Sequence, residues 1–185
     1  MGAYAGVGCW EVEGTTQMTN SWPLLPNTTG AAFFPSPDHR LWLERRWGIR
    51  PAYALHLGMN PSHAGANTDD LTVRKDQGFT CRMDLDGMFK VNCGTLISTD
   101  PKGLLARGVI LAHPDNVATI LRLAEGAARI IVATGVPPDP LKPLARILFR
   151  ELRGFKLECF GLTADHWPKH SSRLGYDAKL VEFVW

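Results

Sequence analysis

The sequence lacks the features of a membrane-spanning or secreted protein. No stretch approaches the roughly 20 consecutive apolar residues that a transmembrane helix needs. Residues 1–10 are small and apolar, but they have neither a basic start nor a clear cleavage pattern, so we expect no secretory signal. These absences predict a cytoplasmic protein with no membrane partner.

The sequence also has little net charge and no cysteine pattern of a metal site. It contains 20 basic and 18 acidic residues, a formal net charge of +2. This is too small to indicate nucleic-acid binding through bulk charge, although it leaves room for a locally basic face. None of the four cysteines forms a C-x-x-C pair or lies near a histidine at zinc-finger spacing. We therefore expect no zinc or iron–sulfur cofactor.

Signature motifs of several large enzyme classes are missing as well. There is no G-x-x-x-x-G-K-[ST] phosphate loop, and no G-x-G-x-x-G follows an expected strand. The G-x-S-x-G nucleophile elbow and the zinc-deaminase pattern are also absent. The sequence thus argues against nucleotide triphosphatases, nicotinamide enzymes, α/β-hydrolases and zinc deaminases, and it predicts no bound cofactor.

What the chain does contain is enough apolar sequence for one core. Its 185 residues are 45% hydrophobic, which suits a single globular domain. Thirteen prolines and six tryptophans are the unusual entries, and Pro23, Pro26, Pro35 and Pro37 punctuate the beginning of the chain. We interpret residues 1–37 as an extended N-terminal arm and residues 38–185 as a single α/β domain.

Strand and helix patterns alternate along the expected domain. Short apolar or alternating runs predict strands, and apolar residues three and four apart predict helices. The expected strands cover residues 40–47, 53–59, 88–91, 129–134 and 155–162, the expected helices residues 115–126 and 141–153, and residues 180–185 end the chain as a strand or helix end. This alternation predicts a three-layer α/β fold with a central, mostly parallel sheet of about four strands.

Polar residues follow several of these strands where ligands bind in open α/β sheets, beyond the strands' carboxyl ends. Asn60, Asn92 and the segment 163–173 hold these positions, and in a parallel sheet they would meet at one rim. The alternative is that asparagine and serine there simply form turns. Asp69 and Asp70 could hold a hard cation such as Mg²⁺, or they lie in a solvated loop as a turn or helix cap.

An ordered series of motifs resembles domain-of-unknown-function family 1643, a bacterial and phage family. The resemblance covers roughly residues 38–174 and implies a bacterial protein or a phage protein in a bacterial host, with no stated activity. The matching segments are Arg40-Leu41-Trp42, Asn60-Pro61-Ser62-His63-Ala64, Asp69-Asp70-Leu71-Thr72-Val73-Arg74, Val91-Asn92 with Thr99-Asp100-Pro101, and Gly161-Leu162-Thr163 with Pro168-Lys169-His170.

A more distant resemblance suggests a chemistry. Gly58-Met59-Asn60-Pro61 is similar to motif A of the uracil-DNA glycosylase superfamily, and the order of later elements, at Asn92, Thr134-Gly135 and His170-Ser171-Ser172-Arg173, is similar too. This resemblance implies a glycosylase-like fold and a DNA or nucleotide partner. It assigns Asn60 and His170 to catalysis and assigns substrate binding to Gly58, Met59, Pro61, Ser62, Phe79, Asn92, Ser171, Ser172 and Arg173.

The implied reaction is hydrolysis of the glycosidic bond of a uracil-like or modified base. Asn60 would position a water, and His170 would donate a hydrogen bond to the departing base. Asn92 would read the base edge, and Phe79 would stack on the extruded base. Lys169 and Arg173 would contact phosphates. For Arg146 and Arg150, which are expected on one helix, both a phosphate contact and an ordinary solvated face remain open.

The chain departs from the glycosylase pattern in ways that keep other functions open. Ser62 stands where glycosylases usually have glycine, and both prolines of their final His-Pro-Ser-Pro loop are missing. One alternative is a non-catalytic module that binds a nucleotide or nucleic acid. Another is a metal-dependent nucleotide-modifying enzyme that uses Asp69, Asp70 and His63.

Overall fold

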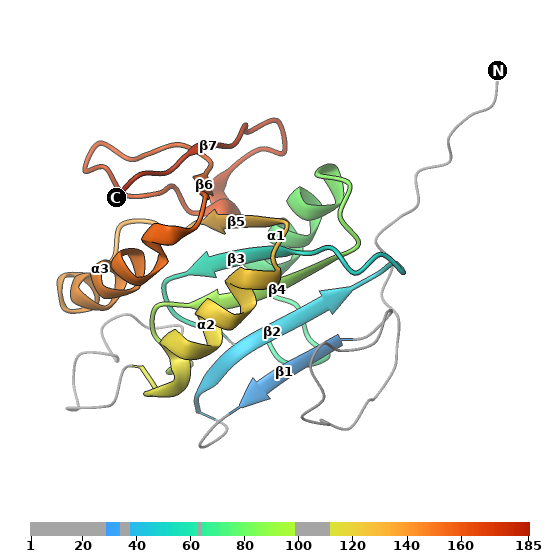
Figure 1. The fold of residues 1–185 in the computed structure, drawn as a ribbon, viewed down its shortest axis with the longest axis horizontal. Helices are drawn as coiled ribbons and strands as arrows, with labels where there is room; N and C mark the ends of the chain where they lie inside the picture. The colour runs from blue at the N-terminus through green and yellow to red at the C-terminus, as the bar shows by residue number, and fades with distance from the viewer. Residues whose placement is uncertain (1–28, 34–37, 63, 99–111) are drawn as a thin grey trace.

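The computed structural model describes residues 29–33, 38–62, 64–98 and 112–185. Most of the expected N-terminal arm, with its four prolines, lies outside the described residues, as does His63. The end of that arm segment contains strand β1 (Thr29–Phe33), which pairs antiparallel with strand β2 (Arg40–Arg46). The sheet therefore begins before residue 38 (Figure 1).

The centre of the fold is a mixed sheet whose strands run in the order β1-β2-β4-β3-β5-β6-β7. The other strands are β3 (Ala54–Gly58), β4 (Gly87–Asn92), β5 (Arg129–Val132), β6 (Leu157–Cys159) and β7 (Val181–Glu182). The four strands β4, β3, β5 and β6 are parallel to one another, while β1, β2 and β7 pair antiparallel at the two edges.

The predicted α/β class is confirmed, whereas the predicted count of about four strands is wrong. The parallel centre has four strands, but three antiparallel edge strands extend the sheet to seven. The sequence of β1, Thr-Gly-Ala-Ala-Phe, shows no alternation of large apolar and polar residues. Strand β7 has only two residues, both exposed. Such edge strands carry little pattern of their own because only one neighbour fixes them.

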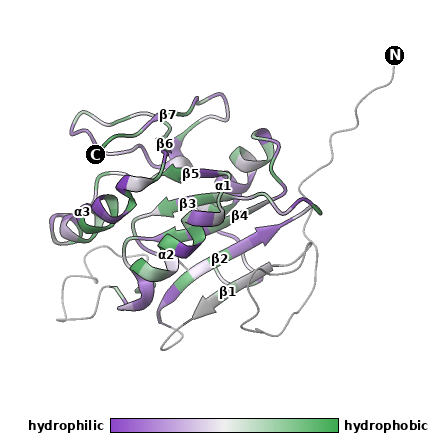
Figure 2. Ribbon diagram, in the orientation of Figure 1, coloured by the Kyte–Doolittle hydropathy of each residue, from purple (hydrophilic) through white to green (hydrophobic). Residues whose placement is uncertain are grey.

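Helices cover both faces of the sheet and form the outer layers. Leu55 and Leu57 of β3 pack in one cluster with Ile120 of α2 (Asp115–Gly126) and Leu148 of α3 (Lys142–Glu151). Ala54 belongs instead to a cluster on the opposite face, with residues of α1 (Leu71–Arg82). Figure 2 shows hydrophobic residues along the central strands and mixed hydropathy along the covering helices. This burial from both sides explains why β3 reads as one apolar run.

Helix α1 is the main element that the sequence patterns did not predict. Its buried residues are Val73, Asp76, Phe79 and Thr80, so half of its inward face is polar and the helical period of apolar residues is hidden. Asp70 caps the helix, because its side chain accepts a hydrogen bond from the backbone N–H of Val73 at 2.8 Å. Of the roles considered for Asp70, the helix cap is the one observed.

The strand order creates a switch point near the middle of the sheet. Along the chain the parallel strands come as β3, β4, β5, β6, but in space β3 lies between β4 and β5. After β3 the chain therefore passes to β4 on one side of β3 and then crosses to β5 on its other side. This reversal of direction opens a crevice at the carboxyl ends of β3 and β5. In the described part of the chain, no helix has the length and apolar character to span a membrane.

Candidate functional site

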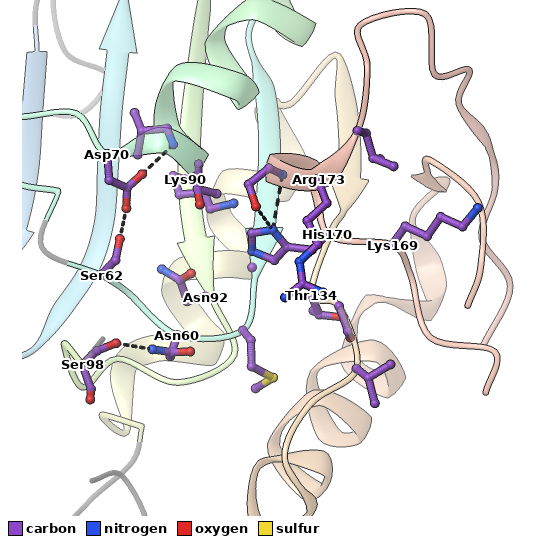
Figure 3. A pocket seen from close by; sticks show the side chains of 18 of the residues that line it. Asn60, Ser62, Asp70, Lys90, Asn92, Ser98, Thr134, Lys169, His170 and Arg173 are labelled. Atoms are coloured by element: carbon purple, nitrogen blue, oxygen red, sulfur yellow. Dashed lines mark hydrogen bonds between the residues drawn. The ribbon is translucent and has the colours of Figure 1, made fainter. Parts of the chain in front are cut away.

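A cavity of about 710 Å³ lies at the carboxyl ends of the parallel strands (Figure 3). This volume is in the range of small-molecule sites, roughly 300–1,000 Å³. Gly58, Asn92 and Thr134 line it from the ends of β3, β4 and β5, as the switch-point rule requires. Its lining residues are Arg40, Gly58, Met59, Asn60, Ser62, Asp70, Thr72, Val73, Lys90, Asn92, Ser98, Thr134, Gly135, Val136, Pro138, Thr163, Lys169, His170, Ser172, Arg173 and Leu174.

Asn60 enters the cavity from the turn after β3. Its Nδ2 donates to the carbonyl oxygen of Ser98 at 2.7 Å and more weakly to that of Pro61 at 3.3 Å. Both bonds use the amide nitrogen, so the orientation of the side chain is fixed and Oδ1 is kept as an acceptor. The predicted role, in which the side-chain oxygen holds a water, is compatible with this orientation.

Asn92 lies at the floor of the cavity and is only 2% exposed. In the orientation of its side-chain amide that suits the neighbouring groups, Nδ2 donates to the carbonyl oxygens of Val91 and Asn60, at 3.3 Å each. These bonds use the donor side of the amide, so Asn92 offers a ligand its acceptor Oδ1 rather than both a donor and an acceptor. A group that pairs with Asn92 must therefore donate a hydrogen bond.

His170 comes from the loop before the short 3-10 helix η4 (Ser171–Arg173), on the opposite side of the cavity from Asn60 (Figure 3). Its Nδ1 accepts the Ser172 hydroxyl at 2.8 Å and the Ser172 backbone N–H at 3.3 Å. Burial lowers the pKa of His170, and the charge of Lys90 lowers it further. The ring is therefore neutral at pH 7 with its proton on Nε2, which is a hydrogen-bond donor.

Two glycines let the walls of the cavity come close together. A Cβ on Gly58 would lie 2.7 Å from the side-chain amide of Asn92 and 3.2 Å from Nζ of Lys90, so only glycine leaves room for both side chains. Gly135 has a φ of +66°, and a Cβ there would lie 3.4 Å from that of His170. Gly58 and Gly135, which both lie in the segments that resemble glycosylase motifs, thus shape the cavity floor and the wall behind His170.

A buried polar network beneath the cavity escaped the sequence reasoning. Lys90 is 3% exposed and its Nζ lies 2.6 Å from Oδ2 of Asp76, which is fully buried. His56 is also fully buried, with Nδ1 3.5 Å from Oδ1 of Asp76 and Nε2 2.7 Å from the Thr80 hydroxyl. The signal in the sequence is a lysine inside the otherwise apolar strand Gly-Met-Phe-Lys-Val-Asn, because buried lysines are rare unless paired.

His56 should make the stability of the fold depend on pH. Burial lowers its pKa to about 4, although Asp76 acts in the opposite direction. An unfolded His56 binds a proton below pH 6.5, whereas the buried ring stays neutral down to about pH 4, so stabilisation that is complete above pH 6.5 is lost across this window. We expect His56 to contribute up to about 3 kcal/mol of this loss.

Urea unfolding at pH 7.5, 6 and 5 measures this dependence. The variant His56→Gln removes the titrating ring, so its unfolding free energy should fall less between pH 7.5 and 5 than that of the unchanged protein. Equal pH slopes for the two proteins would show that His56 is not the group responsible.

Cationic side chains surround the cavity. Arg40 is 2% exposed and lines it from β2, and its pKa, lowered by burial to about 10, keeps it charged at neutral pH. Lys169 and Arg173 are exposed residues that line the cavity near His170. Among the described lining residues the one carboxylate is Asp70, and both its oxygens accept hydrogen bonds, from Val73 and from the Ser62 hydroxyl. The potential inside the cavity is therefore positive.

Most of the residues implied by the glycosylase resemblance meet in this cavity, and three do not line it. Gly58, Met59, Asn60, Ser62, Asn92, His170, Ser172 and Arg173 line the cavity. The three that do not line it, Pro61, Phe79 and Ser171, are all buried, and Ser171 is the first residue of η4. Arg146 and Arg150 lie on α3 outside the cavity lining, where Arg150 forms an ion pair with Glu151 at 3.6 Å. A solvated face is thus the reading that fits the two arginines.

Phe79 does not fit the stacking role predicted for it. Its side chain is 2% exposed, and its ring packs on Phe160 with a centroid distance of 4.2 Å and on Tyr176 at 5.1 Å. Both neighbours occupy the faces or edges that a base would need. The residue lies in the third turn of α1, on the face that covers the sheet, and this placement makes it a core residue.

We expect Phe79→Leu to lower the free energy of unfolding by about 1–2 kcal/mol, because it removes aromatic contacts and leaves part of the volume unfilled. Chemical denaturation measures the loss. Ligand affinity should stay within twofold, since Phe79 does not line the cavity. A large loss of affinity in a stably folded variant would restore the stacking role.

The described residues give little support to a metal centre. Asp69 is held by Arg45 at 2.7 Å and by Gln77 at 2.6 Å, and Asp70 caps α1. Within the residues that the structure describes, no three His, Cys, Asp or Glu side chains gather in a way that would hold an ion. His63, the third ligand considered, lies outside that part of the chain.

Together, the fold and the site define an α/β protein with a polar, cationic cavity at the switch point of its parallel strands. The model of a family described as "Protein of unknown function (DUF1643)" matches residues 40–171. The chain therefore belongs to this family, which confirms the family resemblance of its motifs. No curated protein and no solved structure matches the chain.

Proposed function

We propose that the protein recognises a nucleobase in this cavity and hydrolyses its N-glycosidic bond, on a uracil-DNA glycosylase-like version of the α/β fold. The observation that carries the proposal is that Asn60, Asn92 and His170, which come from distant parts of the chain, line one cavity. Asn60 and Asn92 each present an amide oxygen that accepts hydrogen bonds, and His170 presents an N–H donor. A base edge needs such a set of donors and acceptors.

The proposed chemistry divides between the two sides of the cavity. Cleavage of an N-glycosidic bond passes through a cation-like sugar and leaves negative charge on the departing base. Oδ1 of Asn60 accepts a hydrogen bond from the attacking water and orients it, and Nε2–H of His170 donates to the base as its charge develops. Asn92 accepts a hydrogen bond from a ring N–H of the base.

The reaction is tested by offering the protein a panel of oligonucleotides and nucleotides that carry uracil or modified bases. Released base is detected by mass spectrometry, and abasic sites in the oligonucleotides are detected by cleavage with alkali. We expect release from at least one substrate, and a loss of release in Asn60→Ala but not in the exposed control Asn67→Ala. No release across the whole panel would contradict the proposed hydrolysis.

A non-catalytic nucleotide-binding module is the second candidate. It is favoured by the state of Asp70, the one carboxylate among the described lining residues, because both its oxygens already accept hydrogen bonds and it is not free to act as a general base. In this case His170→Ala weakens ligand binding and no substrate of the panel is turned over. Any turnover that depends on His170 would exclude the module.

A further inference from the structure

The lysine at the cavity floor has hydrogen-bonding capacity that the described protein does not use. Lys90 lies in the middle of β4, is 3% exposed and lines the cavity. Its ammonium group carries three N–H donors, and its one hydrogen-bonded partner in the described part of the chain is Oδ2 of Asp76, at 2.6 Å. Buried donors are almost always satisfied, so the remaining N–H groups call for an acceptor in the cavity.

Asp76 holds this lysine in place through a buried ion pair. Burial alone would raise the pKa of Asp76, but Lys90 and the other groups around it bring that pKa below its ordinary value. The two side chains form an ion pair at 2.6 Å, which fixes the position of the Lys90 ammonium group at the cavity. Because Asp76 comes from α1 and Lys90 from β4, the ion pair joins the helix to the sheet and fixes the ammonium group beside the cavity that Lys90 lines.

The charges around Lys90 favour a ligand with more than one negative charge. Arg40 lines the same cavity with 2% exposure, and Lys169 and Arg173 line it from its outer side. The one carboxylate among the described lining residues, Asp70, already accepts two hydrogen bonds. The described lining thus has four cationic side chains and one carboxylate, although the net charge of the whole chain is only +2. A phosphate monoester matches such a set of donors.

The depth of Lys90 in the cavity favours the phosphate of a free nucleotide over a phosphate within a nucleic-acid strand. A phosphate inside a strand is a diester with a nucleotide on each side. A cavity of this size cannot take in the nucleotides on both sides, so such a phosphate is kept away from the floor. A terminal phosphate has no such attachment and can reach the floor. We propose that the ligand is a nucleotide monomer whose terminal phosphate binds Lys90, and this proposal rests on the proposed function for the recognition of its base.

Titration calorimetry with four probes tests the proposal: deoxyuridine, deoxyuridine 5′-monophosphate, deoxyribose 5-phosphate, and a short single strand with deoxyuridine at an internal position. We expect the monophosphate to bind at least tenfold more tightly than deoxyuridine and than the strand, and deoxyribose 5-phosphate to compete with it. Equal affinities for the nucleoside and the nucleotide, or tighter binding of the strand, would overturn the proposal.

Failure of the proposed function gives a different result. If deoxyribose 5-phosphate binds as tightly as the full nucleotide, the base adds nothing, so nucleobase recognition fails while the phosphate site stands. If none of the four probes binds, both proposals are overturned.

Variants show whether Lys90 is responsible. Lys90→Met would leave Asp76 buried without its partner, so the paired variant Lys90→Met/Asp76→Asn is used and its folding is checked by thermal unfolding. It should lose the preference for the nucleotide over the nucleoside, whereas the exposed control Lys179→Met should keep it. Arg173→Ala, an exposed substitution at the cavity, should reduce the preference severalfold. A full preference in the paired variant would exclude Lys90 as the anion-binding residue.

Discussion

His170→Asn should lower the rate of base release by a factor of about 100–1,000, the usual effect of removing one donor that stabilises developing charge. Asparagine can still accept the hydrogen bond from the Ser172 backbone N–H, as a good N-cap residue does, so η4 should keep its structure. Its amide is too short to place a donor where Nε2 of the imidazole lies. The change therefore removes the donor and leaves the loop intact.

The matched control is His166→Asn. His166 is exposed, does not line the cavity and has a φ of +61°, a conformation that asparagine tolerates well. Its base release should be unchanged. The pH profile gives a second readout. Burial holds the pKa of His170 below its ordinary value, so the neutral donor is present throughout pH 7–9. The rate should therefore show no decrease over this pH range that comes from deprotonation of His170. A rate that drops with a pKa near 7 would mean that a charged imidazole is required.

The parts of the fold that the sequence predicts are those whose pattern is local. The predicted helix at residues 115–126 has the bounds of α2, because its apolar residues repeat at helical spacing. Strands β2 to β5 lie within one or two residues of their predicted bounds, since their burial produces alternating or continuous apolar runs. Helix α1 was missed because Asp76 and Thr80 occupy its buried face. Their partners are Lys90 on β4 and His56 on β3, which only the folded sheet brings to them.

The residues of the site also fall into those that the sequence predicts and those that it does not. Asn60 and Asn92 could be placed at the cavity from sequence because a general rule puts ligands at the carboxyl ends of parallel strands. Lys90 and Arg40 were missed because each belongs to a strand rather than to the turn after one, and their acidic or carbonyl partners come from distant parts of the chain. Phe79 was assigned to the cavity by the glycosylase resemblance, as an aromatic residue that follows motif A, whereas its position on α1 turns the ring into the core.

Asp76→Ala should lower the free energy of unfolding by about 3–5 kcal/mol, because it leaves the ammonium of Lys90 buried without its counter-charge. Natural domains are stable by only about 5–15 kcal/mol, so this one change threatens the fold. The control Asp165→Ala changes an exposed residue and should stay within about 0.5 kcal/mol of the unchanged protein. Urea denaturation measures all three proteins.

The double variant Lys90→Met/Asp76→Leu decides what the pair is for. Replacing both charges by apolar side chains of similar volume is often neutral or even stabilising, so most of the loss caused by Asp76→Ala should be recovered. If stability returns while nucleotide binding does not, the ion pair serves ligand binding rather than stability. The free-energy cost of burying two charges is then the cost of keeping a cation at the cavity floor. If the double variant is as unstable as Asp76→Ala, the hydrogen bonds of the pair are themselves needed to join α1 to β4.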